Sequence, residues 1–212
     1  MNRAATRLSA AILLTNVMTG DALKPYIFGI GKPKTGSNSL RDALELMGLR
    51  CYHTGREQKA KNRGIHNQLL TNMHQGEPPL KHINDDYEAL VDYPIHAIYQ
   101  RLYDDNNDAK FVLTYRHPHD VALSWCRMMQ HKPQPLADRL PTNFKEFALS
   151  VVDHCTEVIE FFLEKPGRLL ILDSRDDDAV KWNLLSKHLE VEAPKGKPFP
   201  HSFNHQKWEP TK

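Results

Sequence analysis

Short apolar runs alternate with amphipathic stretches along this chain. Five runs rich in apolar or β-branched residues have the length of strands: Tyr26–Ile30, Leu49–His53, Ala89–Asp92, Lys110–Tyr115 and Arg168–Leu172. The segments between them mostly repeat their apolar positions at helical spacing. Strands that alternate with helices form parallel sheets covered on both faces. The pattern therefore predicts an α/β fold, a three-layer sandwich with a central parallel β-sheet.

The helical segments are defined by their apolar positions. The first carries residues at i, i+3, i+4 and i+7, namely Leu40, Ala43, Leu44 and Met47, and Gly48 follows as a C-terminal stop. A second, continuous helix is predicted from one apolar face: Ile95, Ile98, Tyr99 and Leu102. Further helices are expected after Pro118, over Phe144–Leu163 and over Asp178–Leu189. Prolines mark residues 130–141 and the tail from Pro194 as irregular segments.

Composition limits the classes of function. The 212 residues suit one domain, and a net charge of +2 is too close to neutral to indicate nucleic acid as a partner. Three cysteines without metal-ligand spacing favour reduced thiols and a cytoplasmic location. No apolar run is long enough to span a membrane.

The N-terminal segment leaves two interpretations open. Arg3 and Arg7 precede an apolar stretch, and no acidic residue occurs before Asp21, as in a transit peptide. The interpretation that we favour is a short amphipathic helix or a frayed leader packed beside the first strand. We therefore divide the chain into a leader or helix at 1–24 and a single domain at 25–212.

A loop rich in Gly, Lys and Ser follows the first strand. Gly31 and Gly36 have the separation found in a Walker A loop, whose pattern is G-x-x-x-x-G-K-[ST]. Ser37 stands where that loop has its lysine, and the lysine, Lys34, comes before Gly36 instead. A strand, a glycine loop and a helix in succession direct backbone N–H groups at one point, as in phosphate-binding sites. We expect a phosphate-like group here, but not an ATPase.

A second basic segment follows the fourth strand. Arg116 comes directly after that strand, and Ser124 lies on the helix that Pro118 opens. A guanidinium and a hydroxyl at the same sheet edge suit a second phosphate. Taken alone, Arg116 also fits a surface ion pair. The strand ends in Arg, whereas a nucleotide triphosphatase usually has a metal-binding Asp there, so a metal–nucleotide site is disfavoured.

The two segments together resemble the sulfotransferase superfamily that uses 3′-phosphoadenosine 5′-phosphosulfate (PAPS), and most closely its small sulfotransferase-like branch. The superfamily's 5′-phosphosulfate loop is matched by Pro33, Lys34, Thr35, Gly36, Ser37, Asn38, Ser39 and Leu40. Its 3′-phosphate motif, R-x-P-x-D-x-x-x-S, is matched by Arg116, Pro118, Asp120 and Ser124. The resemblance covers residues 25–204 and implies the P-loop NTPase-like sulfotransferase fold.

The resemblance also implies roles for individual residues. Residues 33–39 would hold the 5′-phosphosulfate, and Arg116 and Ser124 would hold the 3′-phosphate. Lys34 would protonate or neutralise the oxygen that leaves with the nucleotide. The sulfuryl group would pass to a hydroxyl or amine of a small-molecule acceptor. A neutral SO₃-like group is transferred, so no metal is expected.

The acceptor needs a base, and Asp92 occupies the position that the resemblance assigns to it. A carboxylate at a strand end accepts an alcohol proton more readily when burial raises its pKa. Three alternatives stay open: Asp92 caps the following turn or helix, His53 is the base, or His82 is the base.

Two departures from the family pattern keep other functions open. Asn38 replaces a Thr or Ser, and the C-terminal R-K-G-x-x-G loop is missing, with Lys195–Lys197 or His205–Lys207 as candidate substitutes. A catalytically silent protein that binds PAPS or a related nucleotide is the main alternative. A P-loop kinase is the other, and it lacks both the expected lysine and an acidic metal ligand. The sequence contains no pattern that identifies the acceptor or the oligomeric state.

Overall fold

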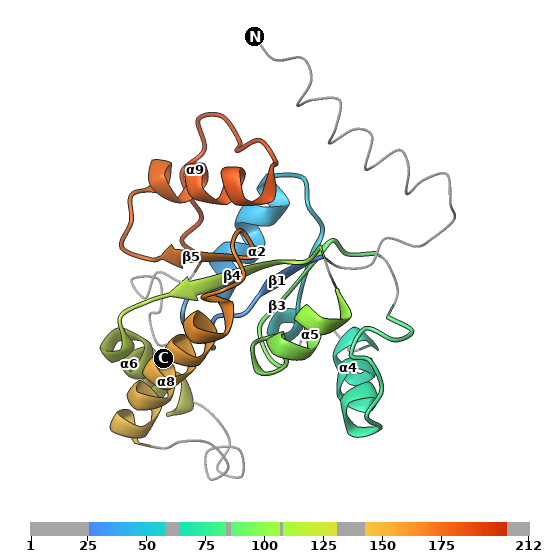
Figure 1. The fold of residues 1–212 in the computed structure, drawn as a ribbon. Helices are drawn as coiled ribbons and strands as arrows, with labels where there is room; N and C mark the ends of the chain where they lie inside the picture. Colours follow the sequence, from blue (N-terminus) through green and yellow to red (C-terminus); the bar gives the residue numbers. More distant parts are fainter. Residues whose placement is uncertain (1–25, 58–63, 84–85, 107, 131–142, 203–212) are drawn as a thin grey trace, which may run out of the picture.

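The computed structural model describes residues 26–57, 64–83, 86–106, 108–130 and 143–202. Within these ranges one parallel sheet has the strand order β2-β3-β1-β4-β5 (Figure 1). Its strands are β1 (Ile27–Gly29), β2 (Cys51–His53), β3 (Ala89–Val91), β4 (Lys110–Tyr115) and β5 (Leu169–Asp173). Each predicted run overlaps one of these strands, and only Asp173 of β5 lies outside its run, so the predicted α/β class and parallel sheet are confirmed.

Helices cover both faces of the sheet. The helical segments are α2 (Ser37–Leu46), α3 (Thr54–Glu57), α4 (Gly64–His74), η1 (Ile95–Ala97), α5 (Tyr99–Asp105), α6 (Pro118–Met129), α8 (Phe144–Phe162) and α9 (Asp178–Leu189). Buried side chains of α2 and α9 pack on one face, and those of α5, α6 and α8 pack on the other. This arrangement confirms the predicted three-layer sandwich.

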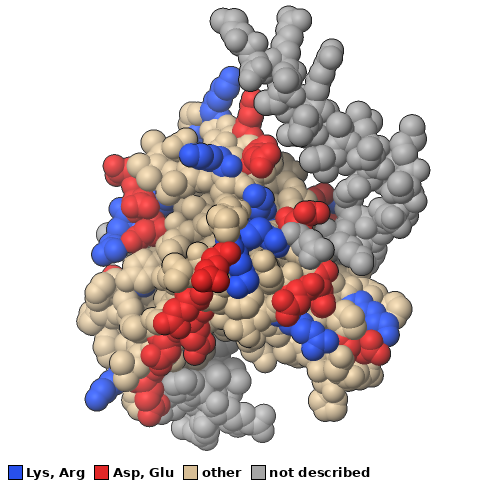
Figure 2. Space-filling model, in the orientation of Figure 1, with Lys and Arg blue, Asp and Glu red and all other residues tan. Residues whose placement is uncertain are grey.

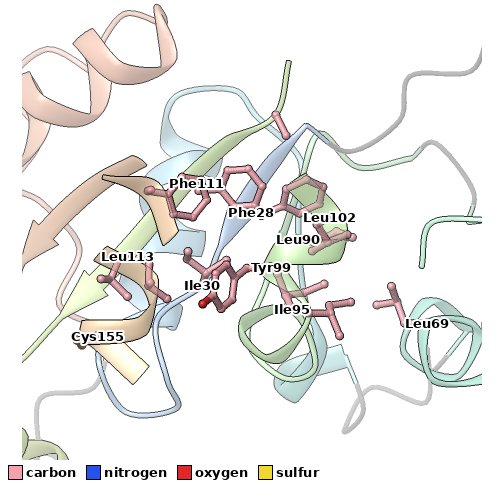
Figure 3. Close-up of a cluster of buried hydrophobic side chains, with 14 of the residues drawn as sticks. Phe28, Ile30, Leu69, Leu90, Ile95, Tyr99, Leu102, Phe111, Leu113 and Cys155 are labelled. Carbon is pink, nitrogen blue, oxygen red and sulfur yellow. The ribbon is translucent and has the colours of Figure 1, made fainter. Parts of the chain in front are cut away.

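The buried side chains of the central strands alternate between the two faces of the sheet, so the hydrophobic core has two parts. Phe28 of β1 and Phe111 of β4 lie in one cluster with Tyr99 of α5 (Figure 3). Ile27 and Val112, their neighbours in the chain, lie in the cluster on the opposite face. Successive side chains of a strand point to opposite faces, so the central strands need apolar residues on both faces here.

The second helix was predicted to be continuous, and this prediction is wrong. A 3₁₀ turn over Ile95–Ala97 is separated from α5 by Ile98, whose φ of −124° is not helical. The apolar positions still face the core, because the turn and the helix each place their own residues inward. Apolar spacing therefore identified the buried face but not the break.

Two helices occur where the sequence predicted none. The helix α3 is a single turn, and the buried positions of α4 include the polar residues His66 and Asn72 beside Leu69. A helix whose inner face is partly polar carries a weak periodic signal.

Other predictions fall partly outside the described residues. The leader at 1–24, with its boundary at residue 25, and most of the loop at 130–141 cannot be compared with the structure. The described part of the tail, residues 194–202, contains no helix or strand, as predicted. None of the helices in the described ranges is long and apolar enough to cross a bilayer.

Charges of both signs are interspersed on the face shown in Figure 2, where a diagonal band of acidic side chains follows α8. The exposed acidic residues of this helix are Glu146, Asp153, Glu157 and Glu160, and exposed Glu164 follows its end. A mixed surface of this kind does not attract anions through bulk charge. An anion site must therefore depend on the placement of a few groups.

Candidate active site

The glycine loop leads from β1 into α2 and forms an anion-binding geometry. Gly36 has a φ of 124°, a conformation that favours glycine, and α2 begins at the next residue. The helix has no side-chain cap and no acidic residue in its first turn. Its first N–H groups and the positive end of its dipole are therefore available to a negatively charged group.

A hydroxyl of β4 fixes this loop. The Thr35 hydroxyl donates to the Lys32 carbonyl at 2.6 Å, so it accepts from the Thr114 hydroxyl at 2.7 Å. A Cβ at Gly31 would lie 2.0 Å from Thr114 Oγ1, which leaves no space for a side chain there. The buried pair of hydroxyls thus ties the loop to the strand that precedes Arg116.

Lys34 and Asp92 come together at the carboxyl edge of the sheet. Lys34 lies in the loop after β1, and Asp92 is the first residue after β3, which pairs with β1. The positive charge of Lys34 acts on the Asp92 carboxyl. Both residues have positive φ, 77° and 79°, and they are two of four non-glycine residues with this conformation in the described ranges. Such strain is concentrated at functional sites.

Asp92 has the environment expected of a base. Burial is the largest influence and raises its pKa to about 6, although backbone N–H groups of Tyr93 and Gly55 and the charge of Lys34 oppose the shift. A Cβ at Gly55 would lie 2.5 Å from Asp92 Oδ2, so a glycine is needed beside the carboxylate. A carboxylate with a pKa close to neutral is well suited to accept a proton.

The structure supports only part of the alternative in which Asp92 caps the following turn or helix. The turn η1 starts after Pro94 without a side-chain capping bond. The carboxylate does hold the backbone of Gly55 in α3, so it also supports the local structure.

Of the two rival bases, only His53 lies beside Asp92. His53 ends β2, is 2% exposed, and places Nδ1 3.5 Å from Asp92 Oδ2 and Nε2 3.1 Å from the Ser37 hydroxyl. His82 is exposed and has a φ of 59°. His53 and the Asp92 carboxylate therefore lie side by side in one site.

Arg116 follows β4 at this edge of the sheet, and Ser124 lies on the helix that comes next in the chain. Arg116 is the first residue after β4 and stands two residues beyond Thr114, which bonds to the loop. The helix α6 starts at Pro118, and its Ser124 is buried. The two predicted phosphate segments thus follow adjacent parallel strands, β1 and β4.

The helix α8 supports the loop from the opposite side. His154 donates from Nε2 to the Ile30 carbonyl at 2.7 Å. Burial lowers the pKa of Lys32, against the opposing charges of Glu157 and Asp153 on α8. Lys32 therefore faces α8, whereas Lys34, two residues further, acts on Asp92.

The described tail runs along α2 and returns to the loop. The Lys197 carbonyl accepts from Trp182 of α9, so the candidate substitute Lys195–Lys197 packs beside that helix. At Ser202 the backbone N–H donates to the Ser39 hydroxyl at 3.3 Å, and the Ser202 hydroxyl bonds to Asp42. The second candidate substitute, His205–Lys207, lies outside the described residues.

Sequence reasoning missed the supporting residues Thr114, Gly55 and His154. Nothing local distinguishes them, because their partners are 79, 37 and 124 positions away in the chain. The pairing of His53 with Asp92 had a usable signal, since both residues end neighbouring parallel strands.

A family model and two solved structures match this chain. The family model described as a sulfotransferase domain matches residues 26–165. A sulfotransferase from Alicyclobacillus acidocaldarius is similar in structure, with 17% identity, a TM-score of 0.49, and coverage of 88% of this chain and 87% of that one. Mouse sulfotransferase SULT7A1, solved in complex with PAP, has 16% identity and a TM-score of 0.50 over 86% of this chain and 63% of its own.

No curated protein sequence matches this chain. The family match spans more than half of the 212 residues, from β1 to the end of α8. The chain therefore belongs to the sulfotransferase family and is an enzyme of that class.

Proposed function

We propose that this sulfotransferase moves a sulfuryl group from PAPS to a hydroxyl or amine of a small-molecule acceptor, without a metal ion. The observation that carries the proposal is the uncapped start of α2 beside a lysine and a buried carboxylate of raised pKa. An anion site and a base at one edge are what sulfuryl transfer from an anionic donor requires.

The donor would be held at both ends. Backbone N–H groups of residues 35–39 and the hydroxyls of Ser37 and Ser39 would bind the 5′-phosphosulfate. The Thr35 hydroxyl, expected from the sequence to assist them, instead donates its hydrogen to the Lys32 carbonyl and holds the loop. Arg116 and Ser124 would bind the 3′-phosphate, since a guanidinium forms paired hydrogen bonds with phosphate oxygens. The PAP bound to the mouse protein of similar fold supports a donor of this kind.

The transfer would use Lys34 and Asp92 in complementary roles. As the acceptor oxygen or nitrogen forms its bond to sulfur, the bond between sulfur and the phosphate oxygen breaks. Asp92 would take the proton of the acceptor, and Lys34 would neutralise the departing oxygen. Asp92 is mostly ionised above pH 6 and therefore ready to accept that proton.

The state of the cysteines supports a reducing compartment such as the cytoplasm. Cys51, Cys126 and Cys155 are all free, and burial raises the pKa of the thiols of Cys51 and Cys155. Buried thiols of raised pKa are unreactive and packed as apolar groups.

Transfer of labelled sulfate from PAPS to a panel of alcohols, phenols and amines tests the proposal. We expect turnover with at least one acceptor in the presence of EDTA. Lys34→Ala should lower it about 100-fold or more, while Lys32→Ala, a change two residues away on the α8 side, should lower it less than about fivefold.

Three results would contradict the proposal in different ways. Tight binding of adenosine 3′,5′-bisphosphate without turnover on any acceptor would favour the silent nucleotide-binding protein. A requirement for ATP and magnesium would favour the kinase. Equal losses in the two lysine variants would remove Lys34 from its assigned role.

A further inference from the structure

Three buried side chains connect the donor loop to the proposed base. Ser37 begins α2, His53 ends β2, and Asp92 follows β3. The Ser37 hydroxyl lies 3.1 Å from His53 Nε2, and His53 Nδ1 lies 3.5 Å from Asp92 Oδ2. The side chains of His53 and Asp92 are 3% and 15% exposed. Water therefore does not screen this row of groups effectively.

The contacts restrict where hydrogens can be without a bound donor. A carboxylate oxygen accepts hydrogen bonds only, so the 3.5 Å contact with Asp92 is favourable when Nδ1 of His53 carries a hydrogen. In a neutral ring the other nitrogen, Nε2, then has none and acts as an acceptor. The hydroxyl hydrogen of Ser37 is consequently directed at His53 and away from the anion site.

An anion at the start of α2 changes this requirement. Ser37 can donate to a phosphosulfate oxygen only if its hydrogen turns away from His53. The Ser37 oxygen then faces His53 Nε2 and can only accept a hydrogen bond from that nitrogen, which must carry a hydrogen. The ring must now carry hydrogens on both nitrogens, or Asp92 must carry the one that lies between Nδ1 and Oδ2. Either arrangement contains one proton more than before, taken from solvent.

We propose that His53 is a positioning residue that couples binding of the anionic donor to the uptake of one proton by the His53–Asp92 pair. This inference rests on the proposed function and names a further residue of the same site. In the loaded state an imidazolium holds the Asp92 carboxylate in place and directs the Ser37 hydroxyl at the donor. Asp92 stays anionic and keeps its second oxygen for the acceptor.

The surrounding charges allow this uptake near neutral pH. The charge of Lys34 disfavours an added proton, whereas the carboxylate of Asp92 and the negative donor favour it. Burial already raises the pKa of Asp92 to about 6, so an added proton costs less here than at an exposed carboxylate. The backbone of Gly55 closes the remaining side, where a Cβ would lie 3.3 Å from His53 Cε1.

Calorimetric titration with adenosine 3′,5′-bisphosphate in buffers of different ionisation enthalpy measures the proton uptake directly. The phosphates of the ligand titrate near pH 6, so the informative quantity is the difference between proteins at one pH. At pH 7.5 we expect wild type to take up about one proton per ligand more than His53→Gln. His74→Gln, a change at an exposed histidine of α4, should match wild type.

A second variant keeps the test decisive if His53→Gln does not fold. Ser37→Ala removes the hydroxyl that links the ligand to His53 and should abolish the same uptake while the backbone N–H groups still bind. The affinity of wild type should also fall as pH rises from 7 to 9, by up to about tenfold per unit, and that slope should be shallower in Ser37→Ala.

Equal proton uptake in wild type, His53→Gln and Ser37→Ala would overturn the inference and leave the proposed function intact. Equal uptake in wild type and Ser37→Ala alone would also overturn it. Absence of any binding of the bisphosphate would overturn the proposed function, and the inference with it.

Discussion

The two residues assigned to the chemistry are held in a backbone conformation that side chains other than glycine rarely adopt. Lys34 and Asp92 have φ values of 77° and 79°, a region that residues other than glycine occupy uncommonly. Strain of this kind costs free energy and persists only where the surrounding structure enforces it. The loop contact with Thr114 and the N–H groups around Asp92 supply that enforcement.

Asp92→Asn separates function from stability. We expect turnover to fall about 100- to 10,000-fold, because an amide cannot accept the proton of the acceptor. Stability should rise. The pKa of Asp92 is raised from 3.8 to about 6 in the folded protein, so its ionisation destabilises the fold as pH rises through that range. The variant should therefore be more stable than wild type at pH 8 by about 1 to 3 kcal/mol.

Thermal or urea unfolding at pH 4.5 and pH 8 checks the stability of this variant. At pH 4.5 the gain should be much smaller, because Asp92 is then largely protonated in the folded state. A variant that is less stable than wild type at pH 8 would mean that the carboxylate serves mainly to hold the backbone of Gly55.

Arg116→Ala tests which end of the donor this residue contacts. We expect the affinity for adenosine 3′,5′-bisphosphate to fall about 10- to 100-fold, because a charge-assisted contact to phosphate is lost. The affinity for adenosine 5′-phosphate, which has no 3′-phosphate, should change by less than about twofold. Titration of both ligands measures this, with Arg101→Ala on α5 as a control. Equal losses for the two ligands would contradict the 3′-phosphate assignment.

Single residues could be predicted where they belong to a local sequence motif. Lys34, Gly36 and Ser37 belong to one contiguous motif, whereas Asp92 was assigned through the family resemblance. The contact between His53 and Asp92 was not predicted, because it depends on how β2 and β3 are aligned. A register shift of one residue would turn His53 to the other face of the sheet.

At the scale of elements, the site depends on the junction between the loop, β4 and α8. The loop has no regular hydrogen-bonded structure of its own, so Thr114 from β4 and His154 from α8 hold it. The helix α8 is fixed in turn by its packing on α6, where Phe147 stacks on Trp125 with ring centroids 4.3 Å apart. The geometry at Lys34 therefore reflects three elements that are distant in sequence.

Thr114→Val tests this junction with a side chain of similar shape. The Thr35 hydroxyl would lose its donor, at a cost of about 0.5 to 1.5 kcal/mol in the free energy of unfolding. The affinity for adenosine 3′,5′-bisphosphate should fall about three- to tenfold, because the loop is held less firmly.

Thr114→Ser is the matched control, since it keeps the hydroxyl, and calorimetry measures both variants. It should bind within about twofold of wild type. If Thr114→Val binds as tightly as wild type, the bond between the two threonines does not position the loop.

Elements with one clear apolar face were predicted well, and those without one were missed. The bounds of β4 and α9 agree with the predicted residues. The helix α4 was missed because polar side chains occupy part of its inner face. The break at Ile98 was missed because a 3₁₀ turn and an α-helix bury residues at nearly the same spacing.

At the scale of the whole molecule, parallel strands bring the two phosphate segments to one edge. The strand order 2-3-1-4-5 places β1 between β3 and β4, so the glycine loop lies between Asp92 on one side and Arg116 on the other. The order of strands in a sheet depends on contacts between distant segments, and a single sequence does not encode it in a local pattern. The family resemblance indicated the fold, and the order of the strands was not predicted.

The central claim is that two anion sites, one after β1 and one after β4, bind opposite ends of the same doubly phosphorylated nucleotide. A crystal structure with adenosine 3′,5′-bisphosphate tests it most directly. The account predicts the 5′-phosphate against the backbone of residues 35–39 and the 3′-phosphate within hydrogen-bonding distance of Arg116. A nucleotide bound with its 3′-phosphate away from Arg116, or bound at another edge of the sheet, would contradict the account.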